Sequence, residues 1–325
     1  MEKCKILIGG KIDDKSVIQE PVIIEGITWE TTRKGEPSKL TFTCIKTEGL
    51  SFSEGNPVSF YYGDTPVFYG FVFEKSRNKD HHIQVTCYDQ LRYLKNKTSY
   101  CFNYVSADTV LSRIANDFKL KTGSLPYTGH VIPRFEQMNV SLFDMILSAI
   151  EETVMATGNL YYLYDDFGKM MLKNIKDSAL DVIINSETAE DFDYSTSIDK
   201  NTYNRIVIAE SEEKDREKYV HADDVINQGN WGVLQHFLTI KNGSQAQSLA
   251  NKMLEFYNKK SSSLSIKRQF GDIRIRAGCG VYITLNLGDI TPTNQRMLVE
   301  KVTHTFDNCD HYMDLTLIGA DTFYD

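Results

Sequence analysis

Short segments of alternating polarity fill about the first ninety residues and restrict the fold more than any other feature of this sequence. In Lys39–Ile45, Leu40, Phe42 and Cys44 occupy every second position, which is the pattern of a strand with one buried face. Similar segments follow at 57–62, 67–73 and 82–88, and Gly63 and Asp64 mark a turn between the first two. So many short strands in so short a stretch predict a small barrel or sandwich at the N-terminus.

The spacing of apolar residues changes from two to three and four after residue 95. One helix is predicted to begin at Ser106, and a second helix with an apolar stripe runs from Ser141 to Gly158. Two apolar segments then flank the glycine-bearing turn at 165–169, which is typical of a hairpin. Residues 96–190 are therefore predicted to form an α+β domain.

Strand signals return at 205–209, and seven consecutive charged residues follow, from Glu212 to Lys218. A run of both signs is typical of a solvated loop that leaves a domain. A third helix is predicted from Ser244 to Lys259, and strands resume at Leu264. We expect residues 191–215 and 262–325 to form a second β domain, with residues 216–261 inserted into it as a helical or α+β segment.

Trp231 lies inside the predicted insertion, between loop signals. An exposed tryptophan at this position would anchor a protein interface, whereas a buried one would cap a small core. Both interpretations stay open, and we take Trp231 as the candidate interface residue.

Three segments of the N-terminal part have counterparts near the C-terminus, in the same order. Each series contains a strand that begins after a glycine, a strand ending in Glu-Lys, a polar turn and an alternating closing strand. The paired segments are 55–60 with 278–283, 72–75 with 298–301, and 82–87 with 311–317. Chance similarity between short strands is the competing explanation, but a true repeat would mean two related barrels in one chain.

Charge and cysteine spacing argue against several classes of protein. The net charge of −8 opposes binding to a phosphate backbone as the main task. The six cysteines include no C-x-x-C pair, so neither a zinc knuckle nor a disulfide framework is indicated. The apolar stretch near Met1 is too short for a signal peptide, and no later run approaches a membrane span. We expect no membrane insertion, no specific nucleic acid, and synthesis in a cytoplasm.

No pattern of catalytic or metal-binding residues stands out. None of the seven histidines belongs to an H-E-x-x-H motif, and His81 and His82 precede a strand, where neighbouring side chains point to opposite faces. The paired carboxylates at 151–152 and 165–166 are adjacent in sequence rather than opposed across a substrate. No local signature supports a nucleophile at Cys87, Cys101, Cys279 or Cys309, and 278–280 is only a fragment of a nucleotide-binding motif. We therefore expect no catalytic residue, cofactor or metal.

Five strings spread along the chain resemble one family, the baseplate hub proteins of contractile phage tails, defective prophages and phage-tail-like bacteriocins. The strings are YDQLRYLKN at 88–96, DDFGKMML at 165–172, DIRIRAG at 272–278, VEKVTHTF at 299–306 and HYMDL at 311–315.

The resemblance implies a mainly β fold with α+β insertions, in which two tail-tube-like β-barrel domains accompany smaller α/β domains. It places the first barrel at residues 1–95 and the second at 191–215 and 262–325. It further implies a homotrimer whose ring joins a six-fold tail tube to a three-fold spike, in contact with other baseplate proteins and the tape-measure protein. The protein would be made in a bacterial cytoplasm and end in a virion or tail-like particle. The family supplies no catalytic residues.

Two other functions compete with this interpretation. A tail-associated cell-wall hydrolase would use one of the cysteines or carboxylates set aside above. A carbohydrate-binding tail module would recognise a cell surface through tyrosine-rich loops, and the chain holds 18 tyrosines.

Overall fold

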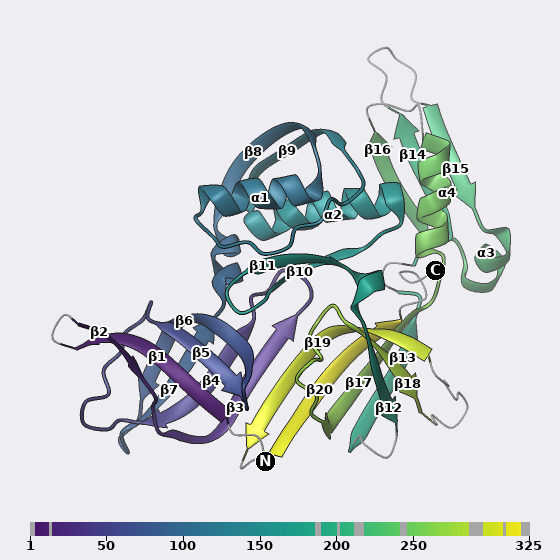
Figure 1. Cartoon of the computed structure of the whole chain (residues 1–325). Helices are drawn as coiled ribbons and strands as arrows, with labels where there is room; N and C mark the ends of the chain where they lie inside the picture. The colour runs from purple at the N-terminus through teal and green to yellow at the C-terminus, as the bar shows by residue number, and fades with distance from the viewer. Residues whose placement is uncertain are drawn as a thin grey trace.

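The computed structural model of the chain describes residues 4–12, 15–185, 190–199, 202–210, 218–240, 246–285, 295–307 and 310–319. These residues form a mainly β molecule in which one large sheet carries an α+β layer and a smaller inserted unit (Figure 1). The predicted mainly β fold class is confirmed.

Seven strands build the first β unit. Along the sheet they follow the order β3-β4-β7-β6-β5-β1-β2, and each neighbouring pair is antiparallel. Leu40, Phe42 and Cys44 of β4 are all buried, as their alternation predicts. The strands are β1 (Cys4–Ile12), β2 (Lys15–Gln19), β3 (Ile23–Thr32), β4 (Lys39–Ile45), β5 (Pro57–Tyr62), β6 (Thr65–Arg77) and β7 (His82–Tyr88).

Six strands build the second β unit, in the order β13-β17-β20-β19-β18-β12. All neighbours are antiparallel except β12 and β18, which run parallel. The strands are β12 (Ala179–Asn185), β13 (Asp191–Ser197), β17 (Ser261–Phe270), β18 (Gly280–Thr284), β19 (Gln295–Asp307) and β20 (Asp310–Gly319).

The structure differs from the expected pair of closed barrels. Closing a unit requires its outermost strands to pair with each other. Instead β3, an outer strand of the first unit, pairs with the C-terminal half of β19, so both units share one 13-stranded sheet. Among the described residues no sheet closes into a barrel, and the main path ends on β2 and β13.

An α+β layer follows β7 and lies above the large sheet (Figure 1). Two helices with buried apolar stripes pack against the antiparallel strand pair β8–β9, and the predicted hairpin at the 165–169 turn is present as β10–β11. Ser141 caps α2, and Gly158 ends it with φ +74°. The elements are η1 (Gln90–Lys95), β8 (Lys97–Val105), α1 (Ala107–Asp117), β9 (Ile132–Ser141), α2 (Leu142–Thr157), β10 (Tyr161–Asp165), β11 (Met170–Asn174) and η2 (Ile175–Ser178).

The inserted unit is a three-stranded sheet covered by one helix. It contains β14 (Arg205–Glu210), β15 (Lys218–Asp223), α3 (Val225–Trp231), β16 (Gln235–Ile240) and α4 (Ala246–Tyr257). We expected 205–210 in the second β domain, but β14 is the central strand of this small sheet. Ile206 and Ile208 pack with Ala250 and Met253 of α4, which holds the strand there. Residues 212–217 of the charged run and Ser244 lie outside the described residues. We propose 202–260 as the inserted unit.

Candidate functional site

The two β units repeat one strand plan. The order β3-β4-β7-β6-β5 in the first unit corresponds to β13-β17-β20-β19-β18 in the second, and every pair in both series is antiparallel. The long strands β6 and β19 both span 13 residues. Each also has a one-residue bulge against its following strand, between Val72 and Glu74 and between Val299 and Lys301. The segments paired in the sequence thus lie in matching strands, but the structure aligns Val72 with Val299, one residue away from the match of the two Glu-Lys pairs.

Backbone hydrogen bonds repeat at the same places. Gly55 N–H donates to the Val72 carbonyl at 2.7 Å, and Val72 N–H donates to the Asn56 carbonyl at 2.9 Å. The same two bonds recur at 2.8 and 2.9 Å in the second unit, where the residues are Gly278, Cys279 and Val299. Both glycines adopt positive φ, +85° for Gly55 and +95° for Gly278. A match at single hydrogen bonds makes chance similarity a poor explanation of the repeat.

The junction between the units is a strand pair with a buried aromatic stack. His304 of β19 lies opposite Trp29 of β3, and their rings stack with centroids 4.9 Å apart. Trp29 is 2% exposed and His304 is fully buried. Burial, followed by the neighbouring His311, lowers the pKa of His304 to about 3, so the ring stays neutral at ordinary pH. The stack at the junction is therefore a buried contact between two uncharged rings.

An ion pair continues this junction past the end of β3. Arg33 N–H donates to the Glu300 carbonyl at 2.9 Å, and its guanidinium Nε meets a Glu300 carboxylate oxygen at 2.6 Å. The Arg33 side chain is 6% exposed, so this pair is shielded from solvent screening. Both backbone and side chain thus fix the register of β19 on β3.

Two carboxyl groups meet where the first unit, the second unit and the α+β layer join. Asp89 is buried and accepts hydrogen bonds from Leu91 N–H at 3.0 Å and Ser38 N–H at 3.1 Å. Asp165 accepts from Gln90 Nε2 at 2.8 Å. Burial raises the pKa of Asp165 to about 6, and burial followed by Asp165 raises the pKa of Asp89. No local pattern in the sequence indicates this pair, because the two residues are remote from each other in the chain.

The surroundings of these carboxyls favour a structural role. The Arg276 guanidinium from the second unit lies 4.8 Å from the ring centroid of Tyr164 and donates to the Asp165 carbonyl at 3.3 Å. The cavity beside Asp89 and Asp165 measures about 20 Å³, which is room for a water molecule and not for a substrate. Asp89 and Asp165 therefore tie three parts of the chain together.

Other candidate chemistry from the sequence is not assembled into a site. Within the described ranges no three His, Cys, Asp or Glu side chains are grouped to hold a metal ion. Burial raises the pKa of the Cys87 and Cys279 thiols, the latter to about 11, and a hydrogen bond to Glu136 raises that of Cys101. A raised pKa disfavours the reactive thiolate. Cys309 lies outside the described residues.

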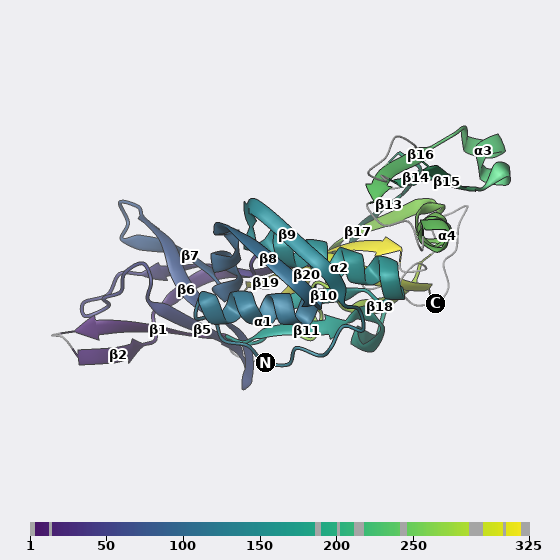
Figure 2. The same cartoon turned by 90° about the horizontal axis from the view of Figure 1, so that it is seen from above.

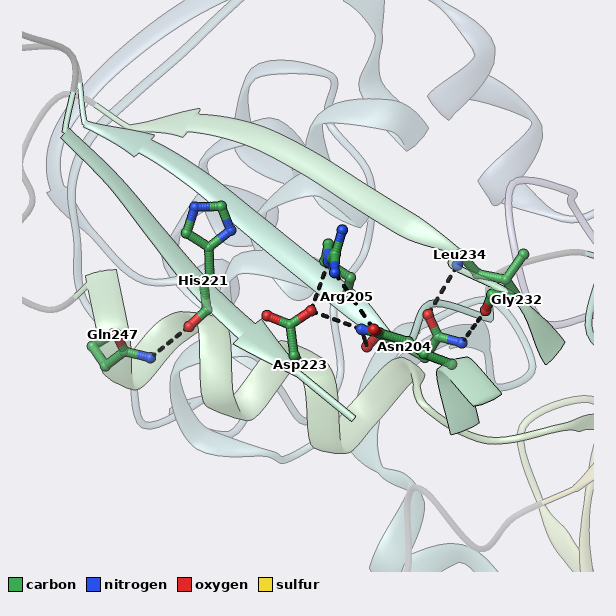
Figure 3. A network of polar contacts seen from close by, with 8 residues as sticks. Asn204, Arg205, His221, Asp223, Gly232, Leu234 and Gln247 are labelled. Carbon is green, nitrogen blue, oxygen red and sulfur yellow. Dashed lines mark hydrogen bonds and ion pairs between the residues drawn. The ribbon is translucent and has the colours of Figure 1, made fainter. Parts of the chain in front are cut away.

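Trp231 is half-buried at the end of α3, between the two environments considered for it. A polar network fixes the loop that follows it (Figure 3). The Asn204 side chain donates to the Gly232 carbonyl at 2.7 Å and accepts from Leu234 N–H at 2.9 Å, while Arg205 Nε pairs with Asp223 at 2.6 Å. No residue of α3 is buried. The network thus holds Trp231 on a firmly attached, solvent-facing element.

A groove of about 1570 Å³ lies between α2, α4 and the edge formed by β13 and β17. Its lining mixes apolar side chains with basic and acidic ones, including Lys34, Glu152 and Phe256.

Among the described helices, none has the length and apolar character needed to cross a membrane.

Comparison with known proteins gives a family for the chain. The YQBQ-like family profile matches residues 27–318. The chain is 30% identical over 312 residues to the phage-like element PBSX protein XkdQ of Bacillus subtilis strain 168, covering 93% of this chain and 94% of that protein. Similarity of fold extends to two kinds of tail-related structure.

The first such structure is the 43 kDa tail protein of prophage MuSo2 from Shewanella oneidensis, with a TM-score of 0.69, 11% identity, and coverage of 98% of this chain and 99% of that one. The second is the E. coli c3393 protein, a type VI secretion component described as structurally similar to T4 tail proteins gp27 and gp5. Its TM-score is 0.55 at 7% identity, with 93% of this chain and 75% of that one covered. The chain therefore belongs to the YQBQ-like family of phage tail baseplate-type proteins.

Proposed function

We propose that this chain is the structural hub of a phage-like contractile tail baseplate. In this role three copies form a ring that adapts the six-fold tail tube to the three-fold spike. The observation that carries the proposal is the repeated strand plan, in which two β units of one chain are joined through β3 and β19. Three chains with two such units supply six similar units around an axis, which satisfies both symmetries with one gene product.

The character of the relatives supports this proposal. XkdQ is named as a protein of a phage-like element, and the c3393 protein is described as resembling the tail proteins gp27 and gp5. The proposed partners are two further copies of the chain, the tail tube protein, the spike protein, other baseplate proteins and the tape-measure protein. The proposed role is non-enzymatic, and Trp231 is proposed as a contact residue for one of the baseplate partners.

Light scattering of the purified protein tests the ring. Three chains of 37.1 kDa give a particle of about 111 kDa, and we expect that mass together with three-fold rings in negative-stain electron micrographs. A monomer at every concentration that also binds neither tube nor spike protein contradicts the proposal. A clearing zone on cell-wall substrate, lost on Cys101→Ser, would instead support the hydrolase.

A further inference from the structure

We infer that the ring closes through a specific strand pair between copies: the free edge of β6 in one copy pairs antiparallel with the free edge of β13 in the next. This inference rests on the proposed function and adds to it the interacting surface and its register. The partner it names is a second copy of this chain.

The internal repeat supplies the template for this pair. Within one chain, one edge of β19 pairs with two strands. The N-terminal half of β19 pairs with β18, and its C-terminal half pairs with β3 along the same edge. In the repeat, β6 corresponds to β19 and β13 corresponds to β3. The contact equivalent to β19–β3 is therefore β6–β13, and only a second copy can supply it because six strands separate β6 from β13 in the sheet of one chain. Figures 1 and 2 show β13 and the first unit at opposite ends of the molecule.

The register follows from equivalent residues. The bulges and the glycine-linked hydrogen bonds align Val72 with Val299, which aligns Glu74 with Lys301 and Arg77 with His304. Leu40 and Leu264 occupy equivalent core positions in the two units. Trp29 lies opposite Leu40 and Tyr194 lies opposite Leu264 in their strand pairs, so Tyr194 corresponds to Trp29. Transferring the β19–β3 register gives four opposed pairs between copies: Glu74 with Ser197, Lys75 with Thr196, Ser76 with Ser195 and Arg77 with Tyr194.

Exposure supports this assignment. Trp29 and His304 are buried at the internal junction, whereas Tyr194 is half-buried and Arg77 is exposed. The same difference holds at every other equivalent position except Glu74, whose counterpart Lys301 is exposed as well. In the described part of the chain no strand pairs with the outer side of β13. An unpaired strand edge leaves backbone groups ready for a partner strand.

The side chains of the two edges complement each other. At the end of β6 and the turn after it, Lys75, Arg77 and Lys79 outnumber Glu74 and Asp80, which leaves a net charge of +1, and the exposed Asp191 and Asp193 give β13 negative charge. The register sets the Arg77 guanidinium against the Tyr194 ring, where His304 stacks on Trp29 inside the chain. A cation over an aromatic face is a favourable contact that takes the place of the neutral aromatic pair. The contact joins two different surfaces of the same chain, so it extends from copy to copy and closes when the rotation allows.

Disulfide trapping tests the register. The pair Ser76→Cys and Ser195→Cys is placed in a chain that also carries Cys4→Ser, Cys101→Ser and Cys309→Ser, so that the natural cysteines that remain are the buried Cys44, Cys87 and Cys279. Opposed residues of neighbouring strands lie within the roughly 4.4–6.8 Å Cα separation that a disulfide spans. The matched control, Ser76→Cys with Ser197→Cys, is two residues out of register and beyond that span. We expect covalent trimers on non-reducing gels from the first pair and not from the second.

The outcomes separate the two proposals. If light scattering gives a trimer but the in-register pair cross-links no better than the control, the strand pairing is wrong and the ring proposal stands. If the chain is monomeric and no cross-link forms, both fail. A second measurement needs no cysteine: Arg77→Ala should raise the dissociation constant of the trimer interface about 5-fold, while Tyr194→Phe, which keeps the ring, should change it less than about 2-fold. Equal losses from both variants, or none from Arg77→Ala, contradict the inference.

Discussion

Replacing Asp165 by asparagine will change how the stability of this protein depends on pH. Burial raises the pKa of Asp165 to about 6, and the same residue helps to raise the pKa of Asp89. In the unfolded chain the carboxyl has its usual pKa near 3.8. Between these values the unfolded chain releases a proton that the folded chain retains. The stabilisation is therefore fully present below about pH 4 and is lost as the pH rises through about 6.

The size of the effect follows from the difference between the two pKa values. A gap of roughly two units at about 1.36 kcal/mol per unit corresponds to a loss of about 3 kcal/mol in the free energy of unfolding between pH 4 and pH 7. Asparagine cannot titrate, so Asp165→Asn should lack this fall. The variant also forgoes one of the two hydrogen bonds that Asp165 accepts, from Gln90 Nε2 and Gly168 N–H, which lowers its stability by a similar amount at every pH.

Urea unfolding at pH 4, 5, 6, 7 and 8 measures this difference. Tryptophan fluorescence is a suitable signal, because Trp29 lines the small cavity beside Asp89 and Asp165. Asp166→Asn is the matched control, since that side chain is 59% exposed and forms only a 3.9 Å pair with Arg276. Wild type and Asp165→Asn curves that run parallel across this range would refute the argument that burial holds the proton on Asp165.

Two further predictions concern the repeat and the insertion. Gly278→Ala should destabilise the chain by about 2–5 kcal/mol, because the added Cβ would clash with the Tyr162 ring at a residue whose φ is +95°. The equivalent Gly55→Ala places its Cβ with no atom within 4 Å, so it should cost only about 1–2 kcal/mol of backbone strain. The same urea assay measures both variants. Equal costs would mean that the ring of Tyr162 yields freely. Trp231→Ala should lower stability by no more than about 1 kcal/mol yet reduce incorporation of the chain into tail particles, whereas Phe237→Ala, in β16 of the same inserted unit, should not. Unfolding of the Trp231→Ala protein would support the buried-cap interpretation instead.

Local sequence patterns predicted most of the individual elements. The alternation in Lys39–Ile45 and the apolar stripe between Ser141 and Gly158 each depend on residues close together in the chain, so the period of the pattern indicates the element and its buried face. The matching segments near the two ends also pointed to a possible repeat, because equivalent strands of related units need the same alternation, but short strands alone left chance similarity open. The strand at 205–210 was assigned to the wrong sheet, since its apolar run fits either one.

The candidate site could be predicted only in outline. Trp231 was singled out by residue type, and the structure adds the network around Asn204 that fixes its loop. The carboxyl pair of Asp89 and Asp165 was missed, because each residue by itself looks like a turn residue and only packing brings them together.

By itself the sequence determined the mainly β character of the chain and the two helices of its α+β layer, and it raised the possibility of two related units. Those properties follow from hydrophobic periodicity and turn residues, which act over a few neighbouring positions. Only the tertiary structure decided which strands pair across the chain. The β3–β19 junction joins residues near opposite ends of the sequence, and the backbone groups of a strand edge accept any strand of suitable register. For the same reason, the sequence alone does not say which strand pairs with the edges of β6 and β13, which we propose are covered by another copy.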